Sequence, residues 1–266
     1  MTTIGIGIIC GGEMRVETTI SIFNTTALDR ALTEQGLRSS RLLGCLIVKP
    51  WGPYLDMGRN AIVRDFLDLF EDDYLLFIDS DIVFTFPDIA RIHAELDAHP
   101  EFNVLAGVYY SPISIGEKPL PVVYTWESAA KSGQMVLSAD RNLATDGNIY
   151  EKDAVGTGFM AIRRSYLKEL DEDPGDDHPL KFFRNAVING AYHGEDLEFC
   201  HRLKVRTGHG PYVHTGIQVT HIKSAMMYQG DTHHMSGAIP LGFVQGFGEP
   251  LQATFQVPEP PSIPLV

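Results

Sequence analysis

Two aspartates separated by one serine follow a short apolar run in the first half of the sequence. Residues 74–78 are apolar apart from a tyrosine hydroxyl, and Asp79, Ser80 and Asp81 come directly after them. Alternate residues of extended backbone point to the same side, so Asp79 and Asp81 can present two carboxylates to one place. Paired carboxylates suit Mg²⁺ or Mn²⁺. Two solvated aspartates starting a turn are the alternative, and the position directly after a buried strand favours the metal hypothesis.

A second acidic pair opens a predicted helix in the second half. Glu195 and Asp196 follow Gly194, and the helical spacing of apolar residues continues until Gly208. Acidic residues in a first helical turn stabilise a helix by about 1 kcal/mol and need no function to explain them. The functional alternative is a general base that the helix dipole keeps ionised beside a metal-bound substrate.

Histidines are concentrated in one part of the chain, because seven of the ten lie between His193 and His234. His221 ends an alternating stretch with Ile217 and Val219, which places it at a strand end. A single histidine at such a place is more often structural than a ligand. An imidazole that joined two carboxylates would complete a mixed oxygen and nitrogen coordination set. We interpret the adjacent pair at 233–234 as loop.

Arg59 and Asn60 start the helical pattern that leads to the aspartate-bearing strand. An arginine there can pair with a diphosphate through two parallel hydrogen bonds, because the guanidinium fork matches phosphate oxygens. An exposed arginine on a first helical turn is the alternative, and the spacing favours neither.

The elements that must position these residues alternate between strand and helix. This order predicts βαβ units and an open parallel sheet with helices on both sides. In such sheets, ligands bind beyond the carboxyl ends of the strands, where Asp79 and Asp81 lie. The predicted strands are 4–10, 42–48, 74–78 and 103–108, and the predicted helices are 15–31, 58–70 and one opened by Pro87 and Asp88.

The second half is less regular. We predict a strand over 121–126, a loop or hairpin over 128–150, and an acidic loop over 171–179. An apolar run over 154–162 contains the segment Gly156-Thr157-Gly158, which indicates a close approach of the backbone to another group.

Composition limits the classes of partner. The chain has 266 residues, with 21 Lys and Arg against 34 Asp and Glu, for a net charge of −13. This charge argues against nucleic acid or an anionic membrane as the main partner. An anionic ligand would need a local source of positive charge, such as a metal ion or a helix N-terminus. Three cysteines are too few for a disulfide framework, and no apolar stretch reaches the length of a membrane span. We interpret the N-terminus as a buried strand and expect a cytoplasmic protein.

The length suits one large domain with an appendage. We predict a single domain over residues 1–239, with a nucleotide-binding half (1–110) and an acceptor half (111–239). The tail, residues 240–266, holds six prolines and neither Lys nor Arg. We expect it to lie extended along the domain or a neighbouring subunit, which makes it a candidate contact for a homo-oligomer.

Five segments in this order resemble the GT-A glycosyltransferases, in particular the family-2-like and small bacterial or phage-encoded enzymes. The likeness covers roughly residues 4–224 and implies a GT-A-like open, mostly parallel twisted sheet flanked by helices. The segments are RNAIVRDFL, YLLFIDSDIVF, VGTGFMAIRR, HGEDLEFCHRLK and VTHIK.

The resemblance also implies site residues. Asp81 would bind Mn²⁺ or Mg²⁺ directly, Asp79 would contact the metal or the ribose, and His221 would complete the metal set. Asp196 would be the base, or in a retaining reaction the carboxylate that positions the donor sugar, and Glu195 would orient a sugar hydroxyl. The donor would be a nucleotide-diphosphate sugar, UDP- or GDP-linked, and the acceptor a glycan or a protein. The residues implied for nucleotide-sugar binding are Ile9, Cys10, Gly11, Arg59, Asn60, Asp79, Ser80, Gly158 and Lys223.

Two other functions remain open from the sequence. A sugar-phosphate nucleotidyltransferase also uses an open α/β sheet and Mg²⁺, but it needs a Gly-rich basic loop after the first strand, which residues 11–15 match weakly. A nucleotide-sugar or carbohydrate-binding module would bind without turnover. Four aromatic residues are candidates to line an acceptor site in either case, although packing is the default for each: Trp51, Tyr109, Tyr110 and Trp126.

Overall fold

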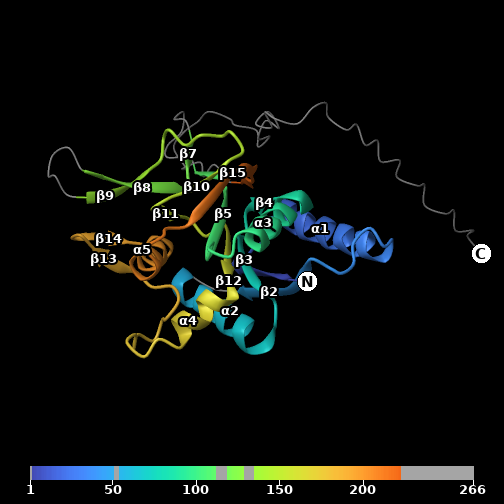
Figure 1. Cartoon of the computed structure of the whole chain (residues 1–266), viewed down its shortest axis with the longest axis horizontal. Coiled ribbons are helices and arrows are strands. Elements are labelled where there is room, and N and C mark those ends of the chain that lie inside the picture. The colour runs from blue at the N-terminus through green and yellow to red at the C-terminus, as the bar shows by residue number, and fades with distance from the viewer. Residues whose placement is uncertain (1, 51–53, 112–118, 129–134, 223–266) are drawn as a thin grey trace, which may run out of the picture. The chain divides into compact units, whose positions relative to one another are not determined.

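A computed structural model describes residues 2–50, 54–111, 119–128 and 135–222, all within one compact unit, 1–224 (Figure 1). Lys223, Trp51 and the predicted tail lie outside the described residues. The unit is built around a seven-stranded sheet in the order β10-β15-β5-β12-β3-β1-β2. Its strands are β1 (Ile4–Cys10), β2 (Leu43–Pro50), β3 (Tyr74–Asp79), β5 (Val104–Val108), β10 (Ile149–Glu151), β12 (Phe159–Arg163) and β15 (Tyr212–Gln218).

Most strands of this sheet run in one direction. β1 pairs parallel with β2 and β3, and β15 pairs parallel with β5. β12 runs antiparallel to both β3 and β5, so these two strands share a direction, and β10 is antiparallel to β15. The carboxyl ends of β1 and β3 therefore lie at the same edge, with Ile9 opposite Asp79.

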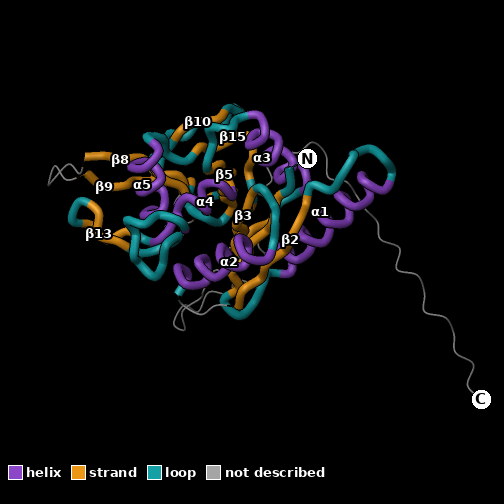
Figure 2. The backbone as a smooth tube through the Cα atoms, turned by 60° about the horizontal axis from the view of Figure 1, so that its bottom comes forward, coloured by secondary structure: helices purple, strands orange, loops and turns teal. Residues whose placement is uncertain are grey.

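Helices cover both faces of the sheet (Figures 1 and 2). The β3 strand is apolar throughout because both of its faces are buried. Leu75 and Phe77 belong to one hydrophobic cluster, and Leu76 and Ile78 belong to the other. The first cluster includes side chains of α2 (Leu55–Leu69), α4 (Arg164–Asp171) and α5 (Glu195–Thr207), and the second includes those of α3 (Phe86–Ala98). The remaining helix among the described residues is α1 (Val16–Glu34). This arrangement confirms the predicted α/β class.

Short strands complete the fold around the carboxyl edge. β4 (Ile82–Val83) pairs with β16 (Thr220–His221), and β8 (Val123–Ser128) lies between β9 (Met135–Ala139) and β11 (Ala154–Val155). The remaining pairs are β6 (Tyr110–Ser111) with β7 (Leu120–Pro121) and β13 (Ala186–Ile188) with β14 (Ala191–His193). No helix among the described residues is long and apolar enough to span a bilayer.

The close approach predicted for residues 156–158 is confirmed, because a Cβ on Gly156 would lie 2.2 Å from the Tyr109 hydroxyl, at the point where the chain leaves β11 and enters β12. One local prediction differs from the structure. α2 begins three residues before the predicted start at residue 58. The helix opened by Pro87 is confirmed, and the Asp88 carboxylate accepts a hydrogen bond from the Thr85 N–H at 2.8 Å.

Candidate functional site

Asp81 and His221 meet at the carboxyl edge of the sheet. Asp79 ends β3, and the chain turns through Ser80 and Asp81 into β4. Because β4 pairs with β16, His221 lies opposite Ile82. The His221 Nε2 atom is 3.2 Å from an Asp81 carboxylate oxygen. Two residues that are 140 positions apart in the sequence are thus neighbours through one short strand pair.

The His221 ring is held in one orientation. Its Nδ1 lies 3.1 Å from the Tyr110 carbonyl oxygen, and the ring packs edge-on against Tyr109 at 5.3 Å between centroids. A carbonyl only accepts, so Nδ1 carries the hydrogen, and in the neutral ring Nε2 then presents a lone pair. A lone pair that faces a carboxylate oxygen is favourable only with a proton or a metal cation between them. This geometry fits a divalent ion, because metal-binding histidines commonly donate their other nitrogen to a carbonyl.

Asp79 faces a different partner. The Arg59 side chain from α2 is 5% exposed, and its Nη2 lies 3.5 Å from an Asp79 carboxylate oxygen. Arg59 Nη1 forms an ion pair with the Glu195 carboxylate. Within the described part of the chain, no group of three or more His, Cys, Asp or Glu side chains is gathered for a metal. The structure therefore brings Asp81 and His221 together, and it joins Asp79 to Glu195 through Arg59.

Asp196 lies close to this bridge, in the first turn of α5. Burial raises the pKa of its carboxyl above the usual range; the Arg59 guanidinium opposes this, and the Asp79 carboxylate adds to it. One Asp196 oxygen accepts the Leu197 N–H at 2.8 Å. The acidic pair at 195–196 and the aspartate at the end of β3, which the sequence treats as separate motifs, thus interact electrostatically.

Tyr109 packs against His221 and Gly158, so the packing alternative holds for this residue and it is not an exposed candidate for an acceptor site. It is buried, and burial raises the pKa of its hydroxyl well above the usual value, with a contribution from the Asp79 carboxylate. The Gly158 N–H donates to this hydroxyl at 3.1 Å, and the Gly158 carbonyl accepts the Asp79 N–H at 3.1 Å. A Cβ on Gly158 would lie 2.7 Å from Tyr109 Cζ. The glycine thus gives the tyrosine access to the backbone beside Asp79.

The other residues implied for nucleotide binding lie around the same edge. The Asn60 amide bonds the protein's own backbone, donating to the Phe183 carbonyl at 2.6 Å and accepting the Phe182 N–H at 3.0 Å. Ile9 is buried opposite Asp79, and Cys10 and Gly11 become progressively more exposed beyond it. The Ser80 carbonyl accepts the Arg15 N–H at 2.9 Å.

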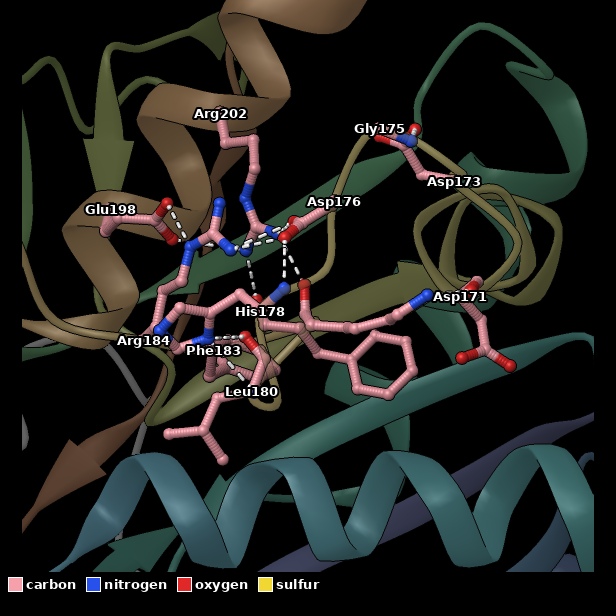
Figure 3. A network of polar contacts seen from close by, with 12 residues as sticks. Asp171, Asp173, Gly175, Asp176, His178, Leu180, Phe183, Arg184, Glu198 and Arg202 are labelled. Carbon is pink, nitrogen blue, oxygen red and sulfur yellow. Dashed lines mark hydrogen bonds and ion pairs between the residues drawn. The ribbon is translucent and has the colours of Figure 1, made fainter.

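A partly buried ionic network holds the helix that carries Glu195 and Asp196 (Figure 3). Arg184 bonds both oxygens of Asp176, at 2.8 and 2.9 Å, and lies 3.2 Å from Glu198 on α5. Arg202, one turn further along α5, bonds Glu198 at 3.1 Å and the Phe182 carbonyl at 2.5 Å. This network was not predicted from the sequence. Its signal was the acidic loop over 171–179, whose charges need partners on a neighbouring element.

The comparisons with known proteins concern the fold. No known protein family and no curated protein sequence matches the chain. Among solved structures, GalNAc-T7 with UDP, GalNAc and Mn²⁺ aligns with a TM-score of 0.50 and 13% identity, over 86% of this chain and 44% of that one. A197 from STIV aligns with a TM-score of 0.49 and 16% identity, over 87% of this chain and all of that one. The chain thus spans less than half the length of GalNAc-T7, and the likeness confirms a GT-A-like fold.

Proposed function

We propose that this protein is a metal-dependent glycosyltransferase that moves a sugar from a nucleotide-diphosphate sugar to an acceptor hydroxyl. The observation that carries the proposal is that a possible cation site and a group of partly buried acidic residues lie at the same edge of the sheet. Asp81 and His221 form a two-residue site for a cation, and Arg59 links the adjacent Asp79 to the acidic pair on α5. The GT-A-like fold and the Mn²⁺ and UDP in the GalNAc-T7 structure support the same assignment.

The residues around the cation site suit a diphosphate donor. Asp81 and His221 would hold Mn²⁺ or Mg²⁺, which keeps further positions for phosphate oxygens and water. When bound, the ion supplies the positive charge that a chain of net charge −13 lacks, and it stabilises the diphosphate as that group leaves. Asp79, held by Arg59, would contact the ribose or the same ion.

Asp196 is the proposed base. In an inverting reaction it takes the proton of the acceptor hydroxyl while the hydroxyl oxygen attacks the anomeric carbon and the bond to the diphosphate breaks. Its raised pKa brings the carboxyl closer to the pH at which a base works efficiently. In a retaining reaction the same carboxylate positions the donor sugar. Glu195, fixed by Arg59, orients a sugar hydroxyl beside it.

Thermal unfolding with UDP, GDP, CDP and dTDP, each with and without Mn²⁺, tests the binding half of this proposal. A ligand at about 100 times its Kd stabilises by roughly 2.7 kcal/mol, which raises the midpoint by several degrees. We expect one nucleotide to give a Mn²⁺-dependent shift that Asp81→Asn removes. Asp177→Asn, an exposed carboxylate outside the site, should retain it. A shift that survives Asp81→Asn contradicts the metal assignment.

The transfer half is tested with Asp196→Asn. The amide keeps the size of the side chain but cannot take a proton, so the variant should keep the Mn²⁺-dependent nucleotide shift and lose transfer of a labelled donor sugar by at least about 100-fold. Transfer at the wild-type rate would remove Asp196 from the mechanism. A nucleotide shift without transfer to any acceptor in the wild type would favour a binding module.

A further inference from the structure

An aromatic cluster lies beside the proposed base. Trp126, on β8, packs edge-on against His193 at 5.7 Å between ring centroids and against His201 at 6.2 Å. His193 ends β14 directly before Gly194, and His201 lies on α5. The cluster therefore adjoins both sides of the acidic pair at 195–196. The mechanism proposed above uses none of its members.

His193 carries a buried nitrogen without a partner. The residue is 6% exposed, and its Nε2 has no hydrogen-bond partner among the described residues. A buried polar atom left unpaired is unfavourable, and native proteins pair most such atoms. A ligand hydroxyl within reach of Nε2 would supply the missing bond.

β8 is linked to α5 through Asp153. The Trp126 N–H donates to an Asp153 oxygen at 2.9 Å, and Asp153 forms an ion pair with Lys204 of α5. Tyr124 lies two residues before Trp126, on the same side of the strand. Tyr124 and Leu197, the residue after Asp196, both pack against the hydrophobic cluster that contains Phe199 of α5. Burial raises the pKa of the Tyr124 hydroxyl, and the Asp196 carboxylate adds to this.

The main chain of β8 is largely occupied up to Trp126. Residues 124–128 pair with β9 on one edge, and on the other edge Val123 and Tyr124 pair with β11 while the Trp126 N–H donates to Asp153 at 2.9 Å. An extended polypeptide bound by strand addition needs a run of free N–H and C=O groups, which this part of β8 does not offer. A ligand at this place therefore meets side chains: aromatic surfaces, an imidazole nitrogen and the adjacent carboxylates. A sugar ring presents both an apolar face of C–H groups and a rim of hydroxyls that match them.

We propose that Trp126, Tyr124 and His193 form an acceptor subsite for a carbohydrate ring, with Trp126 packing on the apolar face of the sugar and His193 Nε2 bonding a hydroxyl. This inference rests on the proposed function and makes it more specific: the acceptor is a glycan, and the subsite delivers one of its hydroxyls to Asp196. Polypeptide acceptors are the alternative that the experiment separates.

Tryptophan fluorescence reports on this subsite directly, because the chain holds two tryptophans, Trp51 and Trp126. In a Trp51→Phe background, the emission belongs to Trp126. We expect at least one of lactose, maltose, cellobiose and the methyl glycosides of glucose, galactose, mannose and N-acetylglucosamine to change it saturably below about 50 mM. A peptide containing Ser and Thr should leave it unchanged. If no saccharide changes the Trp126 emission, or if the peptide changes it, the proposal is overturned.

Variants then assign the contacts. His193→Phe fills the same space without a polar nitrogen and should weaken saccharide binding at least tenfold, whereas His193→Gln, which keeps a polar group, should recover part of the loss. Tyr192→Ala removes the exposed neighbour of His193 and should bind as the parent does. Equal affinity in the His193→Phe variant rejects the imidazole contact, even if substitutions of Trp126 fail to fold.

The outcome is separable from that of the transferase proposal. Nucleotide binding is measured by the Mn²⁺-dependent thermal shift, which needs neither Trp126 nor a saccharide. Saccharide binding without that shift keeps the subsite and rejects the donor site. A shift that is unaccompanied by saccharide binding keeps the donor site and rejects the carbohydrate acceptor.

Discussion

Arg59 links the two acidic motifs at the scale of single residues. Its guanidinium contacts Asp79 on one side and Glu195 on the other, and the Asp196 carboxyl is near enough for Arg59 to lower its pKa. One positive charge thus faces three acidic groups. Removing it leaves carboxylates close to one another with little water between them, which is unfavourable for the folded state.

We therefore expect Arg59→Gln to lower the free energy of unfolding by about 2 kcal/mol, since charge-assisted hydrogen bonds to partly buried groups are lost. Arg30→Gln is the matched control, because the Arg30–Glu34 pair is exposed and such pairs contribute little. Urea denaturation of both variants measures the difference. If Arg59→Gln is as stable as Arg30→Gln, the bridge contributes nothing to the fold.

Gly158 provides a second test at this scale. A methyl group there would lie 2.7 Å from Tyr109 Cζ, so Gly158→Ala must displace a buried ring or the backbone beside Asp79. We expect a loss of about 1–3 kcal/mol, as is usual for overpacking. Gly175→Ala, in the exposed acidic turn, should cost less than half as much. Equal losses in thermal or urea unfolding would contradict the role of the close approach to Tyr109.

The sequence was informative about individual residues where the chemistry is local. The motif at 79–81, the position of His221 at a strand end and the preferences of metal ligands were enough to propose that Asp81 and His221 bind one ion. The structure brings these two residues together. The partner of Asp79 could not be found this way. Arg59 looked equally suited to phosphate and to solvent, because its choice depends on how α2 and α5 pack around the sheet edge.

At the scale of elements, the ionic network around Asp176 connects the acidic loop to α5. Arg184 and Arg202 each contact both Asp176 and Glu198, so the loop and the helix share two arginines. Such a network fixes the register of α5 and with it the places of Glu195 and Asp196. The strands and helices with clear periodicity were predicted correctly, whereas this connection has no local signature.

The stability that Asp176 contributes to the packing of α5 depends on pH. Burial raises the pKa of its carboxyl, but hydrogen bonds from Arg184 and the His178 N–H outweigh this, and the net pKa is lowered. A lowered folded-state pKa contributes stability above the unfolded-state pKa of about 4, and this stability is lost as pH falls through the folded-state value.

The wild type should therefore exceed Asp176→Asn by about 2 kcal/mol at pH 7, with the gap closing below about pH 4. Urea unfolding across pH 3–7 measures it. Asp177→Asn, the exposed neighbour, should show no such gap. A difference that is independent of pH would mean that the charge of Asp176 is not what stabilises the loop.

At the scale of the whole molecule, the described residues form two hydrophobic clusters, one on either face of the sheet. The tail over 240–266 is predicted from its prolines to contribute to assembly. A chain that ends at residue 239 should keep the thermal midpoint within about 2 °C, because it retains every residue of these clusters.

The same truncated chain should have a lower mass than the full chain in light scattering at tens of micromolar concentration, since the tail is the predicted contact between copies. Equal masses would exclude the tail from assembly. A fall of the midpoint by more than about 5 °C would place it in the fold of the domain.

The sequence by itself determined the α/β class, the helices on both faces and the position of the aspartates after a central strand. These depend on periodicity and on apolar runs, which are properties of short segments. Only the tertiary structure decided that Asp81 lies next to His221, that Arg59 joins Asp79 to Glu195, and that Gly156 and Gly158 leave room for the Tyr109 ring. Each of these contacts joins residues far apart in the chain, and strand order, which no local pattern encodes, sets which of them become neighbours.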